Sequence, residues 1–138
     1  MLNITAIDIY LGTTNCCVGK WLNGRVEIIT NDLGERTTPS YVSFDGDKIL
    51  VGEEAKFGMI KNEKNTVYDI KKYNDVIVQN VKKLWNFQNT GTSTEITKIQ
   101  VKFQNNIKKF RPEEISVILL LTKRISKKIK KKIKIIEN

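Results

Sequence analysis

The strongest constraint on the fold of this chain is a Gly-Thr-Thr turn between two alternating apolar runs. The runs cover residues 4–10 and 16–22, and Gly12, Thr13 and Thr14 lie between them. Alternation with β-branched residues on both sides of a small polar turn predicts a β-hairpin. Its tip exposes backbone N–H groups and two hydroxyls without a bulky cover, which suits a phosphate. Many turns of this composition bind nothing, so the turn alone leaves both interpretations open.

The rest of the chain predicts short strands mixed with helices. Asn23-Gly24 predicts a second hairpin, leading to a strand over 25–30. Pro112 predicts the start of the last helix, because proline suits the first helical position. The other expected elements are a hairpin at Asp45-Gly46-Asp47, helices over 53–61 and 76–85, a polar loop over 89–94, and strands over 96–103 and 107–110.

The basic charge is concentrated near the end of the chain. Of the net charge of +9, residues 122–138 contribute eight cations against the single acid Glu137. The remainder is close to neutral, which excludes a protein that is basic throughout. The segment Lys123–Lys134 could contact polyanions non-specifically through a helix face, or could be a solvated face without a partner.

Cysteine usage and the start of the chain indicate a reducing compartment. Cys16 and Cys17 are adjacent, so on a strand they point to opposite faces and a bridge between them is not expected. The chain contains no histidine, which argues against a zinc site. No secretory signal and no membrane-spanning apolar run is visible, so we expect a cytoplasmic protein.

Five blocks of sequence occur in an order that is typical of one family. They are Leu11-Gly12-Thr13-Thr14, Gly34-Glu35-Arg36-Thr37-Thr38-Pro39-Ser40-Tyr41-Val42, Val51-Gly52-Glu53-Glu54-Ala55-Lys56, Asn65-Thr66-Val67-Tyr68-Asp69-Ile70-Lys71-Lys72 and Arg111-Pro112-Glu113-Glu114-Ile115-Ser116. This order resembles the start of the seventy-kilodalton heat-shock chaperones. The likeness covers residues 4 to about 125 and is less clear at 73–88 and 89–104. The second block is its most specific part.

The resemblance implies an α/β (α+β) fragment from the first lobe of an actin-like, ribonuclease-H-like ATPase fold. On this reading residues 1–111 form a partial nucleotide-binding domain. It would contain a phosphate hairpin at 10–16 and a small subdomain over about 40–111. Residues 112–138 would form an amphipathic basic helix with a truncated end.

The same resemblance implies roles for particular residues. Gly12, Thr13, Thr14 and Asn15 match the turn that holds the ATP phosphates, and Lys71 matches the catalytic lysine near the terminal phosphate. A cation there stabilises the charge that develops in phosphoryl transfer. Asn15 stands where some relatives carry an aromatic residue. We expect Trp21, Tyr41 and Phe44 to be packing residues rather than ligands.

The first strand departs from the family pattern. Tyr10 stands where the resemblance implies an acid that helps hold Mg²⁺ through water, and Asp8 lies two residues earlier on the same strand face. Positions i and i+2 are about 6.6 Å apart along a strand, so Asp8 does not simply replace that acid. A tyrosine hydroxyl does not supply the anionic oxygen that Mg²⁺ prefers. We therefore expect no protein ligand for the metal and no normal hydrolysis.

The resemblance implies ATP binding and ATP-dependent protein folding, with ATP or ADP, unfolded proteins, J-domain co-chaperones and exchange factors as partners. For this chain alone we expect weak ATP binding without turnover. The alternatives are a non-enzymatic fragment that binds acidic partners through its basic helix, or a degenerate copy without function. Steep salt dependence would favour polyanion binding, whereas discrimination of ATP from other polyanions would favour a nucleotide site.

Overall fold

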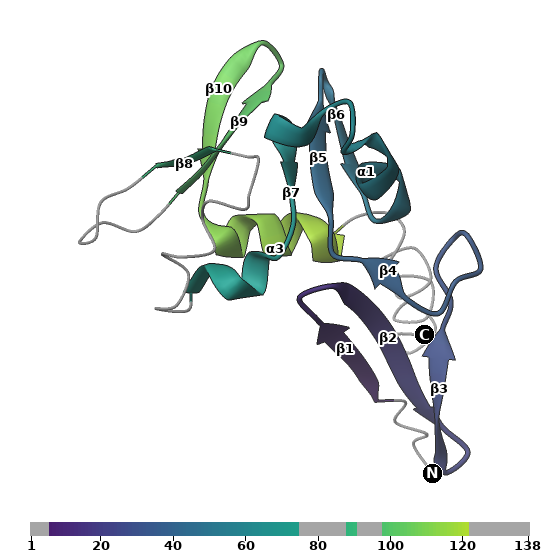
Figure 1. Ribbon diagram of the computed structural model, residues 1–138. Helices are drawn as coiled ribbons and strands as arrows, with labels where there is room; N and C mark the ends of the chain where they lie inside the picture. Colours follow the sequence, from purple (N-terminus) through teal and green to yellow (C-terminus); the bar gives the residue numbers. More distant parts are fainter. Residues whose placement is uncertain (1–5, 75–87, 91–97, 122–138) are drawn as a thin grey trace, which may run out of the picture.

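The computed structural model of the 138-residue chain describes residues 6–74, 88–90 and 98–121 (Figure 1). The strands are β1 (Ile7–Leu11), β2 (Asn15–Leu22), β3 (Arg25–Ile29), β4 (Thr38–Pro39), β5 (Val42–Asp45), β6 (Lys48–Val51), β7 (Thr66–Val67), β8 (Gln88–Thr90), β9 (Lys98–Phe103) and β10 (Asn106–Phe110). The helices are α1 (Glu53–Gly58) and α3 (Pro112–Leu121), with short 3₁₀ turns η1 (Glu63–Asn65) and η2 (Ile70–Asn74). The described chain is therefore a sheet-rich α/β fold.

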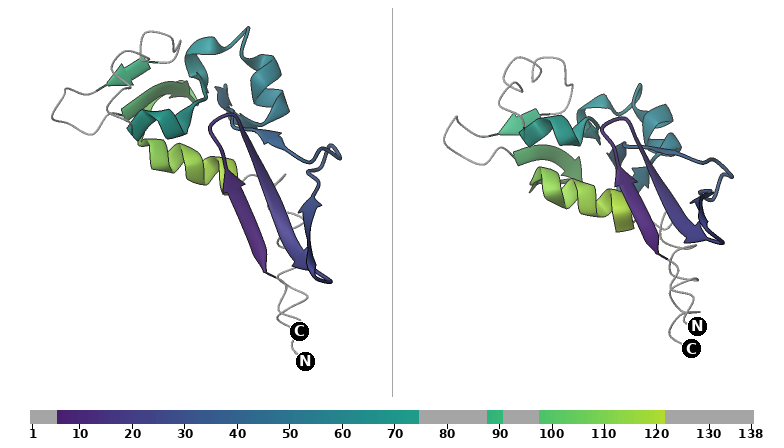
Figure 2. Two further views of the ribbon diagram at one scale, coloured as in Figure 1. Left: turned by 60° about the horizontal axis from the view of Figure 1, so that its bottom comes forward. Right: turned by 90° about the horizontal axis from the view of Figure 1, so that it is seen from below.

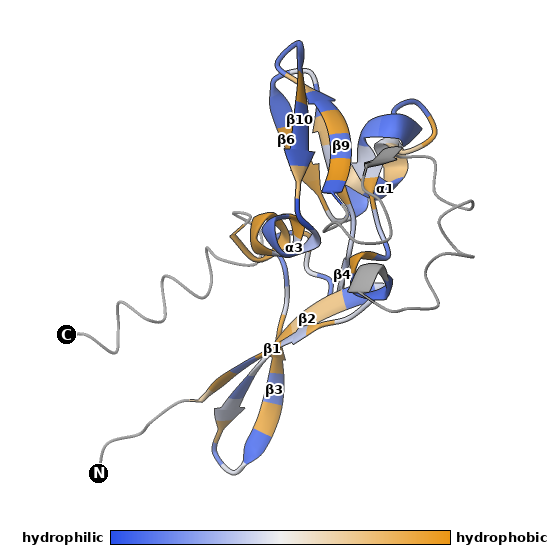
Figure 3. Ribbon diagram, turned by 90° about the vertical axis from the view of Figure 1, so that its left-hand side faces the viewer, coloured by the Kyte–Doolittle hydropathy of each residue, from blue (hydrophilic) through white to orange (hydrophobic). Residues whose placement is uncertain are grey.

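Three small antiparallel sheets make up the fold. The first has the order β1-β2-β3 with β4 paired to the start of β2, the second is β6-β5-β7, and the third is β10-β9-β8. The α3 helix lies between the first sheet and the other two (Figure 1) and is apolar along most of its described length (Figure 3). Its Ile115 and Leu119 are buried because they pack into the common core.

Phe44 joins the second sheet to the third. Its ring stacks on Phe110 with centroids 5.1 Å apart and meets Phe103 edge-on at 5.6 Å. The side chain is completely buried, so these ring contacts are a large share of the apolar area that holds the two sheets together. A backbone hydrogen bond of 2.8 Å from Gln104 to the carbonyl of Gly46 connects the tips of the two hairpins.

Both hairpins predicted between residues 16 and 51 are confirmed. Asn23 and Gly24 have φ angles of 52° and 78°, the pair of positive values that a type I′ turn requires. Gly46, with φ of 60°, lies in the turn between β5 and β6. The start of the last helix at Pro112 is also confirmed.

Four expectations need correction. The helix expected over 53–61 ends at Gly58, because glycine is a poor helix former. Gln88–Thr90, of which the last two residues were expected in a polar loop, is an edge strand paired with β9. The backbone rather than the polar side chains makes this pairing. Asn106 begins β10, while Gln104 and Asn105 form the turn with positive φ angles. Trp21 is 51% exposed rather than packed. The helix expected over 76–85 lies outside the described residues.

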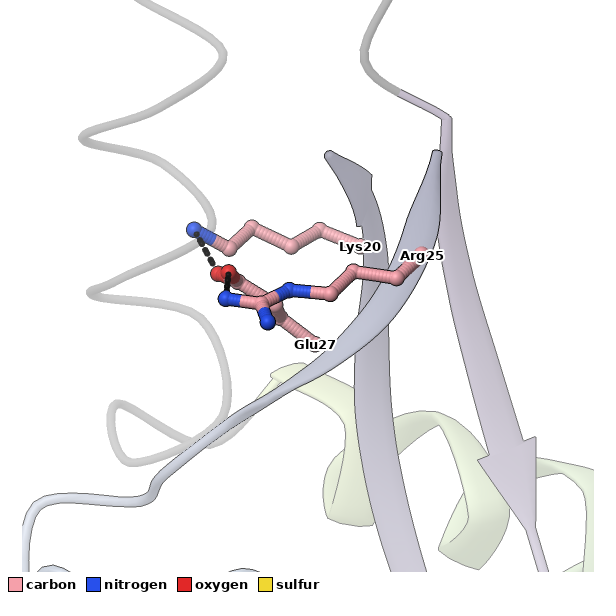
Figure 4. A network of polar contacts seen from close by, with 3 residues as sticks. All are labelled: Lys20, Arg25 and Glu27. Atoms are coloured by element: carbon pink, nitrogen blue, oxygen red, sulfur yellow. Dashed lines mark hydrogen bonds and ion pairs between the residues drawn. The ribbon is translucent and has the colours of Figure 1, made fainter. Parts of the chain in front are cut away.

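A polar network occupies the end of the first sheet that is distant from the Gly-Thr-Thr turn (Figure 4). Glu27 accepts contacts from Lys20 at 2.9 Å and from Arg25 at 3.3 Å, joining β2 to β3. These interactions, led by the hydrogen bond from Lys20, hold the pKa of Glu27 below its ordinary value of 4.5. The network therefore stabilises the pairing of β2 with β3 only while Glu27 is ionised.

None of the helices in the described ranges has the length and apolar character needed to cross a lipid bilayer.

Candidate functional site

The turn between β1 and β2 is short and closed by one backbone hydrogen bond. The register of the two strands ends at the pair Leu11 and Cys16, and the N–H of Gly12 then donates to the carbonyl of Asn15 at 3.1 Å. Gly12 is buried, whereas Thr14 and Asn15 are exposed. Two residues of the predicted site, Thr13 and Thr14, are therefore left at the tip.

Ser40 holds the turn from behind. Its hydroxyl donates to the carbonyl of Gly12 at 2.8 Å, and its backbone N–H donates to the carbonyl of Thr14 at 2.9 Å. Ser40 is 3% exposed, so both bonds lie away from solvent. It follows β4, which pairs with the start of β2, and this pairing fixes its place. Two carbonyls of the turn are thus satisfied by one buried residue.

The amide side of the turn has no such partner. Within the part of the chain that the structure describes, neither Thr13 nor Thr14 donates its backbone N–H to a protein acceptor. The carbonyl of Gly12 shares a peptide unit with the N–H of Thr13, so its hydrogen bond from Ser40 fixes the orientation of that N–H. Successive oriented N–H groups at a turn form a concave donor set that suits an anion.

Gly12 is required by close packing. A Cβ at this position would lie 2.7 Å from Cε1 of the Tyr10 ring and even closer to the carbonyl oxygen of Asn15. The second contact is to backbone and cannot move aside cheaply. The Tyr10 ring therefore lies against the Cα of Gly12, directly beside the candidate phosphate turn.

Lys71 reaches the same place from a distant part of the sequence. It lies on η2, which Figure 2 shows beside the β1–β2 turn, and its Nζ is 5.6 Å from the centroid of the Tyr10 ring. The Tyr10 side chain is 60% exposed and Lys71 is exposed, so this cation–π contact contributes about 0.5–1 kcal/mol. The structure thus places Gly12 and Lys71 each beside the Tyr10 ring.

The neighbouring lysine is held differently. Lys72 pairs with Asp69 at 3.2 Å, three residues earlier in the sequence. Lys71 and Lys72 are consecutive and both exposed, but only Lys71 approaches the turn through Tyr10. The two lysines therefore form a natural matched pair for experiment.

The donor set around the turn does not fit Mg²⁺. Among the described residues no group of three or more His, Cys, Asp or Glu side chains could hold a metal ion. Asp8 lies opposite Gly19 in the register, two residue pairs further from the turn than Tyr10. Its carboxylate therefore does not take the position that Tyr10 occupies beside the turn. Mg²⁺ prefers anionic oxygen ligands at near-octahedral geometry, and the Tyr10 ring supplies none.

Ser40 is the residue that sequence reasoning assigned no role in this site. It belongs to the second of the five blocks, residues 34–42, which carries the most specific part of the family resemblance. The available signal was a small hydroxyl residue directly after a proline in the most specific block. Its partner Gly12 is 28 residues earlier, a separation that no local pattern reveals.

The structure defines the class of this protein as a mixed α/β fold in which Ser40 supports the β1–β2 turn and Lys71, distant in sequence, contacts the Tyr10 ring beside it. Comparison with known proteins specifies the class further. The family model described as Hsp70 protein matches residues 6–136. The chain belongs to the Hsp70 family, whose members have an actin-like ATPase nucleotide-binding domain.

Individual relatives agree with this assignment. The chain is 48% identical over 123 residues to heat shock cognate 70 kDa protein 3 of Dictyostelium discoideum, covering 85% of this chain and 20% of that protein. It is 42% identical over 120 residues to the heat shock 70 kDa protein of Emericella nidulans, covering 83% of this chain and 18% of the relative. The chain thus spans about a fifth of the length of these relatives.

Proposed function

We propose that this chain binds the phosphate groups of ATP as part of an Hsp70-type chaperone. The observation that carries this proposal is the pair of hydrogen bonds from Ser40 to the carbonyls of Gly12 and Thr14, beside backbone N–H groups of Thr13 and Thr14 that have no protein acceptor among the described residues. An anion at the tip would receive these donors, while Gly12 permits its close approach. Asn15, the first residue of β2, closes the turn.

Lys71 would supply the positive charge of the site. Its Nζ is placed over the Tyr10 ring, which lies beside Gly12 of the turn. A cation beside oriented amides strengthens phosphate binding because both interactions favour the same negative charge. We assign Lys71 as a phosphate-binding residue and, by family likeness, as the catalytic lysine.

The chain alone should not turn over ATP. Phosphoryl transfer requires donors that converge on the phosphate chain and the attacking water within hydrogen-bond reach. The described residues provide donors to one side only, from the β1–β2 turn and η2. We therefore propose weak binding without hydrolysis, with residues 1–111 acting as part of a first lobe.

The partners and place of action belong to the whole protein. We propose that unfolded clients, J-domain co-chaperones and exchange factors meet the longer Hsp70-type protein in the cytoplasm. The basic segment Lys123–Lys134 and its expected polyanion contact lie outside the described residues.

Calorimetric titration of the 138-residue chain with ATP, inorganic triphosphate and adenosine tests the proposal. ATP and triphosphate should bind and compete, and adenosine should not. Lys71→Ala should weaken the affinity for triphosphate about tenfold, a loss of about 1.4 kcal/mol. Lys72→Ala is the matched control, since its lysine is paired with Asp69. Adenosine that binds as tightly as ATP, or equal losses of affinity in Lys71→Ala and Lys72→Ala, would contradict the proposal. A phosphate-release assay checks that ATP is not turned over.

A further inference from the structure

We infer that the turn takes a metal-free phosphate chain in preference to its Mg²⁺ complex, with Tyr10 holding Lys71 in place of a metal as the source of positive charge. This inference rests on the proposed phosphate-binding function. It concerns which ionic form of the ligand the site selects, and it starts from the one residue that departs from the expected pattern.

The position of Tyr10 decides what stands beside the turn. Its ring lies beside Gly12, and the ammonium of Lys71 lies over it at 5.6 Å from the centroid. A carboxylate at this position would instead place a negative charge next to the bound phosphate, which only a bridging cation could compensate. The ring adds no charge and supports a lysine whose side chain would otherwise be unrestrained.

The acids nearest to this group are directed elsewhere. Asp8 shares the strand face of Tyr10 but lies opposite Gly19, further from the turn. Asp69 precedes Lys71 by two residues, and its carboxylate contacts Lys72 at 3.2 Å. The described surroundings of the turn therefore contain a lysine and oriented amides without a carboxylate ligand.

Such a donor set favours the form of the ligand with the higher negative charge. Mg²⁺ coordinates phosphate oxygens and neutralises two of the charges that the amides and Lys71 would otherwise attract. With no acid to bind the far side of the ion, the complex gains nothing from the protein in return. The metal-free triphosphate should thus bind several-fold more tightly than the complex at low salt.

Equilibrium dialysis with inorganic triphosphate and with ATP, in excess EDTA and in saturating Mg²⁺, tests this inference on the full chain. The wild-type chain should bind both ligands more tightly in EDTA than in Mg²⁺, by several-fold and up to about tenfold. Tyr10→Phe keeps the ring and should behave like wild type. Tyr10→Asp should reverse the preference, losing about tenfold in EDTA and recovering in Mg²⁺.

The outcomes separate the inference from the function on which it rests. Binding by the wild-type chain that is equal in the two buffers, or tighter in Mg²⁺, would overturn the inference and leave phosphate binding intact. An unchanged preference in Tyr10→Asp would also overturn it, because the ring would then not be the deciding group. Absence of binding in both buffers would overturn phosphate binding itself. Circular dichroism and the urea midpoint of each variant show that the fold is retained.

Discussion

The hydroxyl of Ser40 donates a hydrogen bond of 2.8 Å to the carbonyl oxygen of Gly12, while the backbone N–H of the same serine is bonded to the next carbonyl but one, that of Thr14. One buried residue therefore sets the orientation of the whole turn. This relationship links the most specific block of the sequence to the most chemically suggestive one.

Replacing Ser40 by alanine should destabilise the chain by about 1–3 kcal/mol, because the buried carbonyl of Gly12 loses its donor. Urea denaturation followed by circular dichroism measures the change. Ser116→Ala is the control: that hydroxyl bonds a carbonyl within its own helix, where removal should cost little. Triphosphate affinity should also fall in Ser40→Ala alone, and equal affinity in the two variants would show that the turn does not need this serine.

Gly12→Ala should destabilise the chain by about 1–3 kcal/mol, since the new Cβ would collide with the carbonyl of Asn15 and with the Tyr10 ring. The matched control is Gly58→Ala, at the end of α1, where an added Cβ meets nothing within 4 Å. That change should be neutral or stabilise by up to about 1 kcal/mol because alanine is the better helix former. Urea unfolding midpoints of the two variants and the wild type measure these changes. A midpoint of Gly12→Ala similar to that of Gly58→Ala would mean that the turn accommodates the added Cβ without strain.

The stability that Glu27 contributes should disappear in acid. Its folded-state pKa lies below 4.5, mainly because Lys20 donates a hydrogen bond to the carboxylate. A lowered pKa means that the unfolded chain binds the proton first, so the contribution is complete above pH 4.5 and is lost as pH falls through the folded value. The free energies of unfolding of wild type and Glu27→Gln should differ at pH 7. They should converge once the pH falls below the folded-state pKa of Glu27. A constant gap across the range would argue that the network in Figure 4 is not electrostatic in origin.

Cys16 should react with alkylating reagents far more slowly than Cys17. Burial raises the pKa of the Cys16 thiol from 9.0 to about 11, and its Sγ donates to the carbonyl of Thr38 at 3.3 Å. The thiolate is the nucleophile, so the folded chain keeps Cys16 protonated and shielded at pH 8. Mass spectrometry after iodoacetamide treatment should find Cys17 modified first.

Two variants and a titration extend the cysteine prediction. Cys17→Ser should leave a chain that is labelled only after unfolding, whereas rapid labelling of folded Cys17→Ser would contradict the buried position of Cys16. Because the folded-state pKa exceeds the unfolded one, the stabilising contribution of the neutral thiol holds below pH 9 and falls as pH rises toward 11. Cys16→Ala should remove that alkaline decline.

Local patterns predicted the hairpins well, because Asn23 and Gly24 supply the positive φ angles that few other residue pairs tolerate. They predicted the end of α1 and the strand at Gln88–Thr90 less well. A short edge strand is fixed by backbone pairing with β9, which its own polar side chains do not reveal. The exposure of Trp21 was missed for a related reason: its partner Val26 lies opposite it on the outer face of the sheet, so neither reaches the core.

The candidate site was predictable in its parts but not in its assembly. Gly12, Thr13 and Thr14 follow from the turn chemistry, and Lys71 follows only from the family resemblance. The contact of Lys71 with Tyr10 and the support from Ser40 join segments that are far apart in sequence, and these depend on how η2 and β4 pack. The periodicity of apolar residues that predicts a strand or a helix contains no information about contacts between segments so far apart.

The position of β1 has a practical consequence for any study of this chain. In the described structure β1 pairs only with β2, and Ile9 is 43% exposed along it. Its other edge offers a row of backbone groups that a strand from a second molecule could join. That added strand would lie next to Tyr10, so self-association would compete with triphosphate for the same end of the hairpin. Apparent affinities should therefore decline as protein concentration rises, and dilute samples will report the intrinsic value.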